Sequence, residues 1–365
     1  MELENDDLRH ATHAREAQSA TDGPGRMCYY LQTHNNPAQV TRLVEVLKEG
    51  SPDAIVVISH DIAGPALDNA RLEALPGVHV RLEKGGYGDF SHLGRYFAAI
   101  DWLDENGIEY DWLENFSGQA YPIRPIAEIE QNIAKIAAGG YDGFLLYTPV
   151  FQDTTPKDAD WGAGPEFRLD TKFGARMRYA YRNWRFGRPT PRKQFWLRPF
   201  MAIDLLQPWF RLDLAFCAIG VRRRRIPLPD GWILYGGWFF ATLSRRAVRY
   251  VRDFARHNPE MMEYYRTVSA PEEIFLQTTL LNSGKFRFVP DSRHYIDFSV
   301  TKNGHPRTLD LSDVDKLKAS DAHWARKLDL RQGSELLDVL DEWVRPQGRN
   351  LPARDGHAPA LSDRA

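Results

Sequence analysis

The sequence predicts an α/β fold with a mostly parallel central sheet covered by helices on both faces. Short apolar runs rich in Val, Ile and Tyr alternate with helical patterns through the first 150 residues. Strands that alternate with helices are typical of parallel sheets with helical crossovers. The chain has 365 residues, of which 43% are hydrophobic and 26% charged, so it can bury a substantial core.

The expected elements of the first half follow closely on one another. Five apolar runs predict strands at 28–33, 54–59, 78–82, 110–114 and 143–147. Between the first two, apolar residues at 40, 43, 44 and 47 have the spacing of an amphipathic helix, expected over 37–49. Similar patterns predict helices at 90–106 and 126–138.

The pattern changes after residue 150. Periodicity weakens over 151–225, where Trp, Phe, Tyr and Arg are frequent and 222–225 is a run of four arginines. Long irregular segments are more often functional or mobile than inert. We interpret 151–231 as an insertion in one domain, 27–344, and the polar ends, 1–26 and 345–365, as disordered tails. Further helices are expected at 245–257, 271–282 and 334–344, and strands at 286–289 and 294–297.

Composition excludes several classes of protein. The net charge of −2 argues against bulk electrostatic binding to nucleic acid. Cys28 and Cys217 lie in apolar runs, which predicts buried thiols and a reducing compartment. No apolar run approaches the roughly 18–20 residues that span a bilayer. The 1–26 segment lacks the apolar stretch of a signal peptide. We therefore expect a cytoplasmic protein.

One turn stands where an α/β fold binds its ligand. Ser117-Gly118-Gln119-Ala120-Tyr121 follows the fourth expected strand, and ligands bind outside the carboxyl ends of strands. Four more motifs follow it in order: Gly236-Gly237-Trp238-Phe239, Ala270-Pro271-Glu272-Glu273, Leu281-Asn282-Ser283 and Trp324-Ala325-Arg326-Lys327-Leu328-Asp329. Together they resemble the core-2/I-branching glycosyltransferase family (family 14), with its β-1,6-N-acetylglucosaminyltransferases and peptide O-xylosyltransferases. The resemblance covers 28–329, and we expect a bacterial-type member.

The resemblance implies a GT-A-like nucleotide-sugar-binding fold and an inverting, metal-independent transfer. A sugar, GlcNAc or xylose, would pass from a UDP-sugar to a hydroxyl of a glycan, lipid-linked or peptide acceptor, with no cofactor. The family motif Pro-x-Glu places the catalytic base at Glu273. Arg307 and Lys327 would hold the diphosphate. The other residues implied around the nucleotide sugar are Arg326, Asp61, His34, Ser117, Gly118 and Gln119. Tyr121 and Trp238 are implied in the acceptor pocket.

The residues alone also allow a structural interpretation of the acidic pair. Ser269 and Glu272 have the spacing of a capping box, and Pro271 lies in the first turn. Acids in a first turn also favour the helix dipole. On this interpretation Glu272 and Glu273 stabilise a helix and perform no chemistry.

Three departures from the family pattern keep other functions open. Ala120 replaces the family Asp, Gly236-Gly237 replaces Gly-Ser, and Tyr87-Gly88-Asp89 replaces a Trp-Gly-Gly-like turn. The Ala120 substitution allows a degenerate member that binds nucleotide or glycan without turnover.

Two further alternatives rest on charged residues. A metal-dependent transferase could use Asp158 and Asp160. Neither this pair nor the pair Asp313 and Asp315 directly follows a convincing strand. A membrane-docked scaffold could use the four arginines at 222–225. The Arg- and aromatic-rich stretch 172–225 is expected to bind the acceptor or to rest on anionic lipid at the inner face of the membrane, unless its aromatic residues are core.

Overall fold

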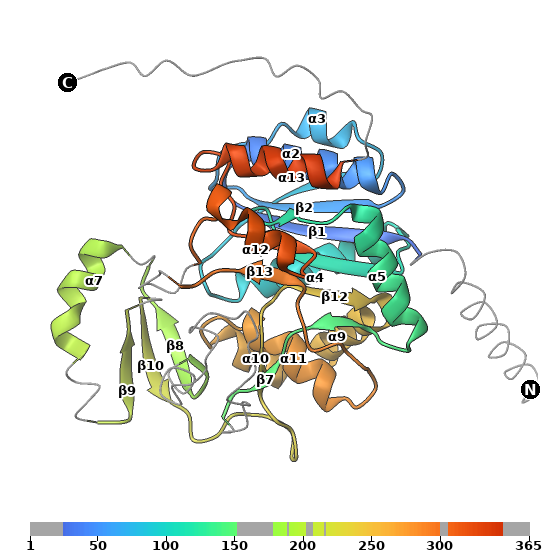
Figure 1. Ribbon diagram of the computed structural model, residues 1–365. Helices are drawn as coiled ribbons and strands as arrows, with labels where there is room; N and C mark the ends of the chain where they lie inside the picture. Colours follow the sequence, from blue (N-terminus) through green and yellow to red (C-terminus); the bar gives the residue numbers. More distant parts are fainter. Residues whose placement is uncertain are drawn as a thin grey trace, which may run out of the picture.

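The computed structural model describes residues 25–151, 178–187, 190–201, 207–214, 217–299 and 306–345. Its centre is a six-stranded sheet in the order β3-β2-β1-β4-β12-β6 (Figure 1). These strands are β1 (Met27–Thr33), β2 (Ile55–Asp61), β3 (Val78–Glu83), β4 (Trp112–Ser117), β6 (Gly143–Leu145) and β12 (Ala241–Ser244). The first four pair in parallel, and β12 runs antiparallel between β4 and β6.

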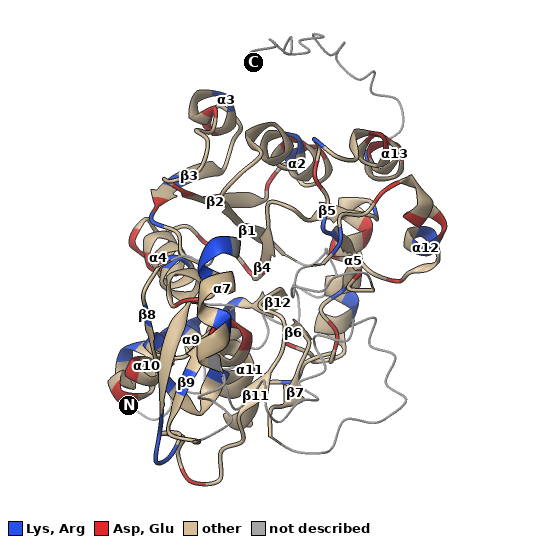
Figure 2. Ribbon diagram, turned by 90° about the vertical axis from the view of Figure 1, so that its left-hand side faces the viewer, with Lys and Arg blue, Asp and Glu red and all other residues tan. Residues whose placement is uncertain are grey.

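Helices cover both faces of this sheet (Figure 2). One face carries α2 (Pro37–Gly50), α5 (Ile126–Ala138), α12 (Val314–Ala319) and α13 (Ser334–Val344). The other carries α4 (Ser91–Glu105), α9 (Arg245–His257), α10 (Pro259–Arg266) and α11 (Glu272–Asn282). Along β1, Cys28 and Tyr30 pack in one core while Tyr29 and Leu31 pack in the other, as the strand period of two requires. The predicted fold class is confirmed.

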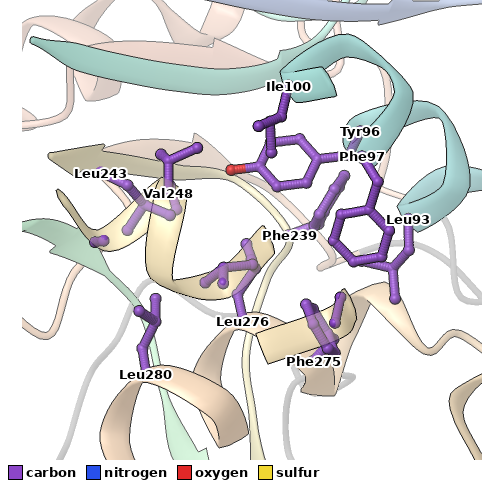
Figure 3. Close-up of a cluster of buried hydrophobic side chains, with 14 of the residues drawn as sticks. Leu93, Tyr96, Phe97, Ile100, Phe239, Leu243, Val248, Phe275, Leu276 and Leu280 are labelled. Atoms are coloured by element: carbon purple, nitrogen blue, oxygen red, sulfur yellow. The ribbon is translucent and has the colours of Figure 1, made fainter. Parts of the chain in front are cut away.

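Aromatic packing fixes α11 against α4 (Figure 3). The rings of Phe97 and Phe275 meet edge to face with centroids 5.3 Å apart, and Tyr96 meets Phe239 at 5.5 Å. Such pairs contribute about 0.5–1.5 kcal/mol beyond the area they bury. The start of α11 is thereby held at a fixed place beside the sheet.

Smaller sheets flank the central one. In the first, β14 (Trp324–Arg326) lies between β13 (His294–Ile296) and β5 (Tyr121–Pro122), and in the second β7 (Thr148–Pro149) pairs with β11 (Tyr235–Gly236). The third has the order β8 (Tyr181–Arg185), β10 (Ala218–Arg222), β9 (Phe210–Asp213) and stands beside α7 (Pro191–Leu197) and η2 (Arg198–Met201). Two short helices, α3 (Asn69–Glu73) and η3 (Leu311–Asp313), complete the described elements.

Some predicted elements differ from the structure. The fourth strand begins at Trp112 and continues to Ser117, and the fifth ends at Leu145. The predicted strand at 286–289 is wrong: this stretch joins the sheet through one parallel bridge between Phe144 and Val289. Only its last residue reaches a partner strand, so no ladder forms.

Other sequence predictions concern the chain's ends and its compartment. Cys28 and Cys217 are buried free thiols, as expected. None of the helices in the described ranges is long and apolar enough to cross a membrane. Most of both expected tails, 1–24 and 346–365, and much of the predicted insertion lie outside the described residues.

Candidate functional site

The carboxyl ends of the parallel strands bring three predicted residues together. His34 follows β1, Asp61 ends β2 and Ser117 ends β4. Asp61 Oδ1 accepts hydrogen bonds from the backbone N–H groups of Ala63 and Gly85, each 3.0 Å long. Desolvation lowers the pKa of His34, Asp61 opposes that shift, and the charge of Lys327 adds to it. His34, Asp61 and Lys327 therefore share one electrostatic environment at this edge.

The Ser-Gly-Gln turn is tied to the end of β14. Ala120 N donates to Ser117 O over 2.9 Å, which closes the turn. A Cβ at Gly118 would lie 2.7 Å from Thr33 Cγ2, so only glycine fits there. Leu328 N donates to Gln119 O over 2.9 Å. Because Lys327 directly precedes Leu328, this bond places Lys327 at the carboxyl-end edge of the central sheet. The side chain of Ala120 itself is fully buried in the core.

Arg307 lies near Lys327 but is held by two carboxylates. Leu309 N donates to Lys327 O over 2.9 Å, which sets the two segments side by side. Arg307 Nε donates to Asp297 Oδ2 over 2.7 Å, and Nη2 donates to the fully buried Asp313. The hydrogen bond with Asp313 raises the pKa of Arg307 above its usual range. Arg307 is thus largely charge-balanced within the protein.

Few hydrogen bonds or opposite charges compensate the charge of Arg326. Its guanidinium lies 5.1 Å from the ring centroid of Phe240, and its buried Nε has no hydrogen-bond partner. Burial lowers the pKa of Arg326 to about 10. A desolvated arginine beside Lys327 provides two cations in sequence at one strand end, which suits an anionic ligand.

Glu273 lies in the first turn of α11, apart from the strand ends. Its Oε2 accepts from Arg178 Nη1 over 2.9 Å and from the Tyr179 hydroxyl over 3.5 Å, and its side chain stays 34% exposed. Gly237 N donates to the Glu273 carbonyl over 2.7 Å. A Cβ at Gly237 would lie 1.9 Å from Leu146 O, so only glycine fits there. The structure thus adds Arg178 and Tyr179, which no motif indicated.

The loop after β3 connects the two groups of residues. Its Gly85 bonds Asp61, as described above. Two residues later, desolvation raises the pKa of Tyr87, Arg178 opposes that shift, and the charge of Glu273 adds to it. Ala270 N, just before α11, donates to Gly88 O over 2.9 Å. One loop therefore runs from the strand-end residues to Glu273.

Trp238 and Tyr121 are both buried. Trp238 packs with Leu146, Ile296 and Phe298 next to Gly237. Tyr121 is fully buried, and its hydroxyl donates to Asp341 on α13. This placement disagrees with the prediction that Tyr121 lines an acceptor pocket, because its side chain points from β5 into the core beneath α13.

The predicted capping box is also absent. Pro271 is the N-cap of α11 and no side chain caps it, while Ser269 is fully buried. Burial, followed by the neighbouring Glu273, raises the pKa of Glu272 to about 8, and its buried Oε2 has no hydrogen-bond partner. The two adjacent glutamates therefore differ, since Glu272 is desolvated whereas Glu273 is ion-paired.

This difference predicts how stability changes with pH. The unfolded chain releases the Glu272 proton near its ordinary pKa of 4.5, whereas the folded protein keeps it until about 8. The wild type should therefore lose stability as pH rises through that window. Glu272→Gln should remove this loss. In urea titrations, the free energy of unfolding of the variant minus that of the wild type should therefore rise between about pH 5 and about pH 9. The exposed first-turn acid Glu335 gives the control Glu335→Gln, and an equal change in both variants would contradict the assignment.

The metal alternatives fall partly outside the structure. Asp158 and Asp160 lie outside the described residues. Asp313 accepts from Arg307 and also from the backbone N–H of Asp310, the N-cap of η3. Within the ranges that the structure describes, no group of three or more His, Cys, Asp or Glu side chains could hold a metal ion.

Comparisons with known proteins give one partial relative. No family model matches the chain. Over 151 residues the chain is 30% identical to the beta-glucuronosyltransferase GlcAT14A of Arabidopsis thaliana. The matched stretch covers 40% of this chain and 33% of the plant protein. The chain thus matches about a third of that relative's length.

A solved structure of CMP:2-keto-3-deoxy-manno-octonic acid synthetase complexed with CTP has a TM-score of 0.30 and 12% identity, over 71% of this chain and 86% of that one.

Proposed function

We propose that this protein is an inverting glycosyltransferase that moves a sugar from a UDP-sugar to an acceptor hydroxyl without a metal ion. The observation that carries the proposal is the arrangement around Glu273. Its carboxylate is held by Arg178 and Tyr179, next to a loop whose other end bonds Asp61 at the strand ends. The partial identity with a plant glucuronosyltransferase supports the sugar-transferase class.

Glu273 acts as the general base. It takes the proton from the acceptor hydroxyl while that oxygen attacks the anomeric carbon from the face opposite to UDP. The bond between the anomeric carbon and the β-phosphate oxygen breaks, and the configuration inverts. Arg178 orients the carboxylate through its ion pair, and a positioned base of this kind contributes roughly 10²–10⁴-fold to the rate.

Cations at the strand ends stabilise the leaving UDP. Lys327 and Arg326 face the developing charge on the diphosphate, since preorganised charges act most strongly where water is excluded. Arg307 supports them and contributes its own charge when the diphosphate competes with Asp297. Asp61 accepts hydrogen bonds from ribose hydroxyls and His34 lies against the nucleoside. The turn from Ser117 to Gln119 positions the donor sugar, and Trp238 supports the acceptor side.

A donor survey tests this function. Isothermal titration with UDP, UDP-GlcNAc, UDP-xylose and UDP-glucuronate should show binding in EDTA that manganese does not improve. One of the three sugar donors should be hydrolysed slowly in the absence of acceptor. Binding without any hydrolysis would point to the degenerate member, and binding that requires manganese would point to Asp158 and Asp160.

A further inference from the structure

One face of the three-stranded sheet of β8, β10 and β9 carries apolar side chains that stay exposed within the part of the chain that the structure describes. Trp184 of β8 pairs with Ile219 of β10, and Ile219 pairs with Leu212 of β9, so the three side chains share one face. Phe210, two residues before Leu212 on β9, lies in the next row of that face. Trp184, Ile219 and Phe210 are all exposed. Residues of the opposite face, such as Tyr181 and Ala218, are buried. Against the described residues the sheet therefore packs with its Tyr181 and Ala218 side, and it projects beside α7 from the main body (Figure 1).

Aromatic residues beside this sheet are exposed as well. Phe195 and Trp196 of α7 are 66% and 67% exposed, and Trp209 before β9 is 63% exposed. Eight of the twelve large hydrophobic side chains that the structure describes as exposed lie between residues 184 and 219. Such concentration marks an interaction site, because scattered apolar residues would be unremarkable. We name this surface the aromatic face; it comprises Trp184, Phe195, Trp196, Phe200, Trp209, Phe210 and Ile219.

Positive charge surrounds the aromatic face. Exposed cations border it on α7, on η2 and at the end of β10 and beyond: Arg192, Lys193, Arg198, Arg222, Arg224 and Arg225. Asp213 is the single acidic residue that the structure describes between 178 and 225. Figure 2 looks onto this side, where Lys and Arg recur along α7 and the neighbouring strands. The surface is thus apolar and strongly basic, although the whole chain carries a net charge of −2.

We propose that the aromatic face docks onto a membrane surface that contains anionic lipid. Trp and Phe favour the boundary between headgroups and acyl chains, and Arg beside them binds lipid phosphate while its apolar stem stays in the interface. A second copy of the chain fits this surface poorly, because like cations would then meet across the contact. The proposal stands on surface chemistry and is independent of the proposed sugar transfer.

Vesicle flotation tests the proposal with the full chain. The protein should float with phosphatidylcholine vesicles that contain phosphatidylglycerol, float far less with pure phosphatidylcholine, and be released by high salt. Arg224→Gln with Arg225→Gln should weaken binding by on the order of tenfold or more. Phe195→Ser with Trp196→Ser should weaken it similarly.

A matched control uses an exposed leucine and an exposed arginine elsewhere. The double variant Leu311→Ser, Arg71→Gln should bind vesicles as the wild type does, and thermal unfolding should show that every variant folds. Equal binding to neutral and anionic vesicles, or no binding to either, would overturn the proposal. So would sedimentation that shows a dimer which the aromatic variants dissociate, because the face would then be a contact between copies.

Discussion

Replacing Glu273 with glutamine is expected to lower turnover about 100-fold or more while UDP affinity stays unchanged. Glutamine keeps the size and the hydrogen bond to Arg178, but it cannot accept the acceptor's proton. The proposed donor site lies at the strand ends, which are separated from Glu273 by the loop after β3. Initial rates with excess acceptor, together with calorimetric UDP titration, measure the two effects separately.

The adjacent Glu272 provides the matched control. Glu272→Gln removes a carboxyl from the same helical turn, so it should change the pH dependence of stability and leave turnover near normal. Near-normal turnover in Glu273→Gln would exclude that residue as the base. Both glutamates would then be interpreted as acids at a helix start.

The second large effect is expected at the diphosphate cations. Lys327→Ala should weaken UDP binding by tens-fold, because a charge-assisted contact contributes roughly 1.5–3 kcal/mol. Arg307→Ala should weaken UDP binding as well. It should also lower the stability of the fold, because Arg307 pairs with a buried carboxylate. The loss of Arg307 removes the hydrogen-bonded cation of the buried Asp313 and leaves only the exposed Lys316 at 3.6 Å, which should destabilise the fold by roughly 3 kcal/mol.

Calorimetric UDP titration in EDTA, repeated with manganese, measures the affinity, and urea unfolding measures the stability. The exposed Lys316, which also contacts Asp313, gives the control Lys316→Ala, and it should change neither quantity appreciably. Affinity that appears only with manganese would refute the metal-free model. Asp158 and Asp160 would then be the residues to replace.

Helices with clear periodicity and boundaries were predictable from the sequence. The predicted ranges of α5, α9 and α13 agree with the structure at both ends. For α9 the boundary has a local cause, since Ser244 Oγ caps the helix by accepting from Ala247 N. The strand β12 was not predicted, because four residues carry too little pattern. Its place between β4 and β6 depends on pairing with distant segments, including a hydrogen bond from the Thr242 hydroxyl to the buried Glu114.

The candidate site was predictable where a motif carried it. Motifs pointed to Glu273, Lys327 and Asp61, although their roles remain predictions. Arg178 was not found, because its ion pair spans 95 residues and lies in a stretch without periodicity. Tyr121 was misplaced for a different reason. A motif gives the position of a residue in the chain, and only the path of β5 decides which side its ring faces.

The pairing of β7 with β11 determines which segment of this protein could be exchanged in an engineered variant. Thr148 pairs with Gly236, and Val150 N donates to Leu234 O over 2.9 Å, so the intervening segment leaves and rejoins the body at one point. Closure entropy grows only with the logarithm of loop length, so a replacement of different length would add little closure cost, whereas it would have to restore the core contacts of Tyr179. Arg178 and Tyr179 would leave with the segment. A graft from a relative would therefore exchange the partners of Glu273, the proposed base, and retain the strand-end residues.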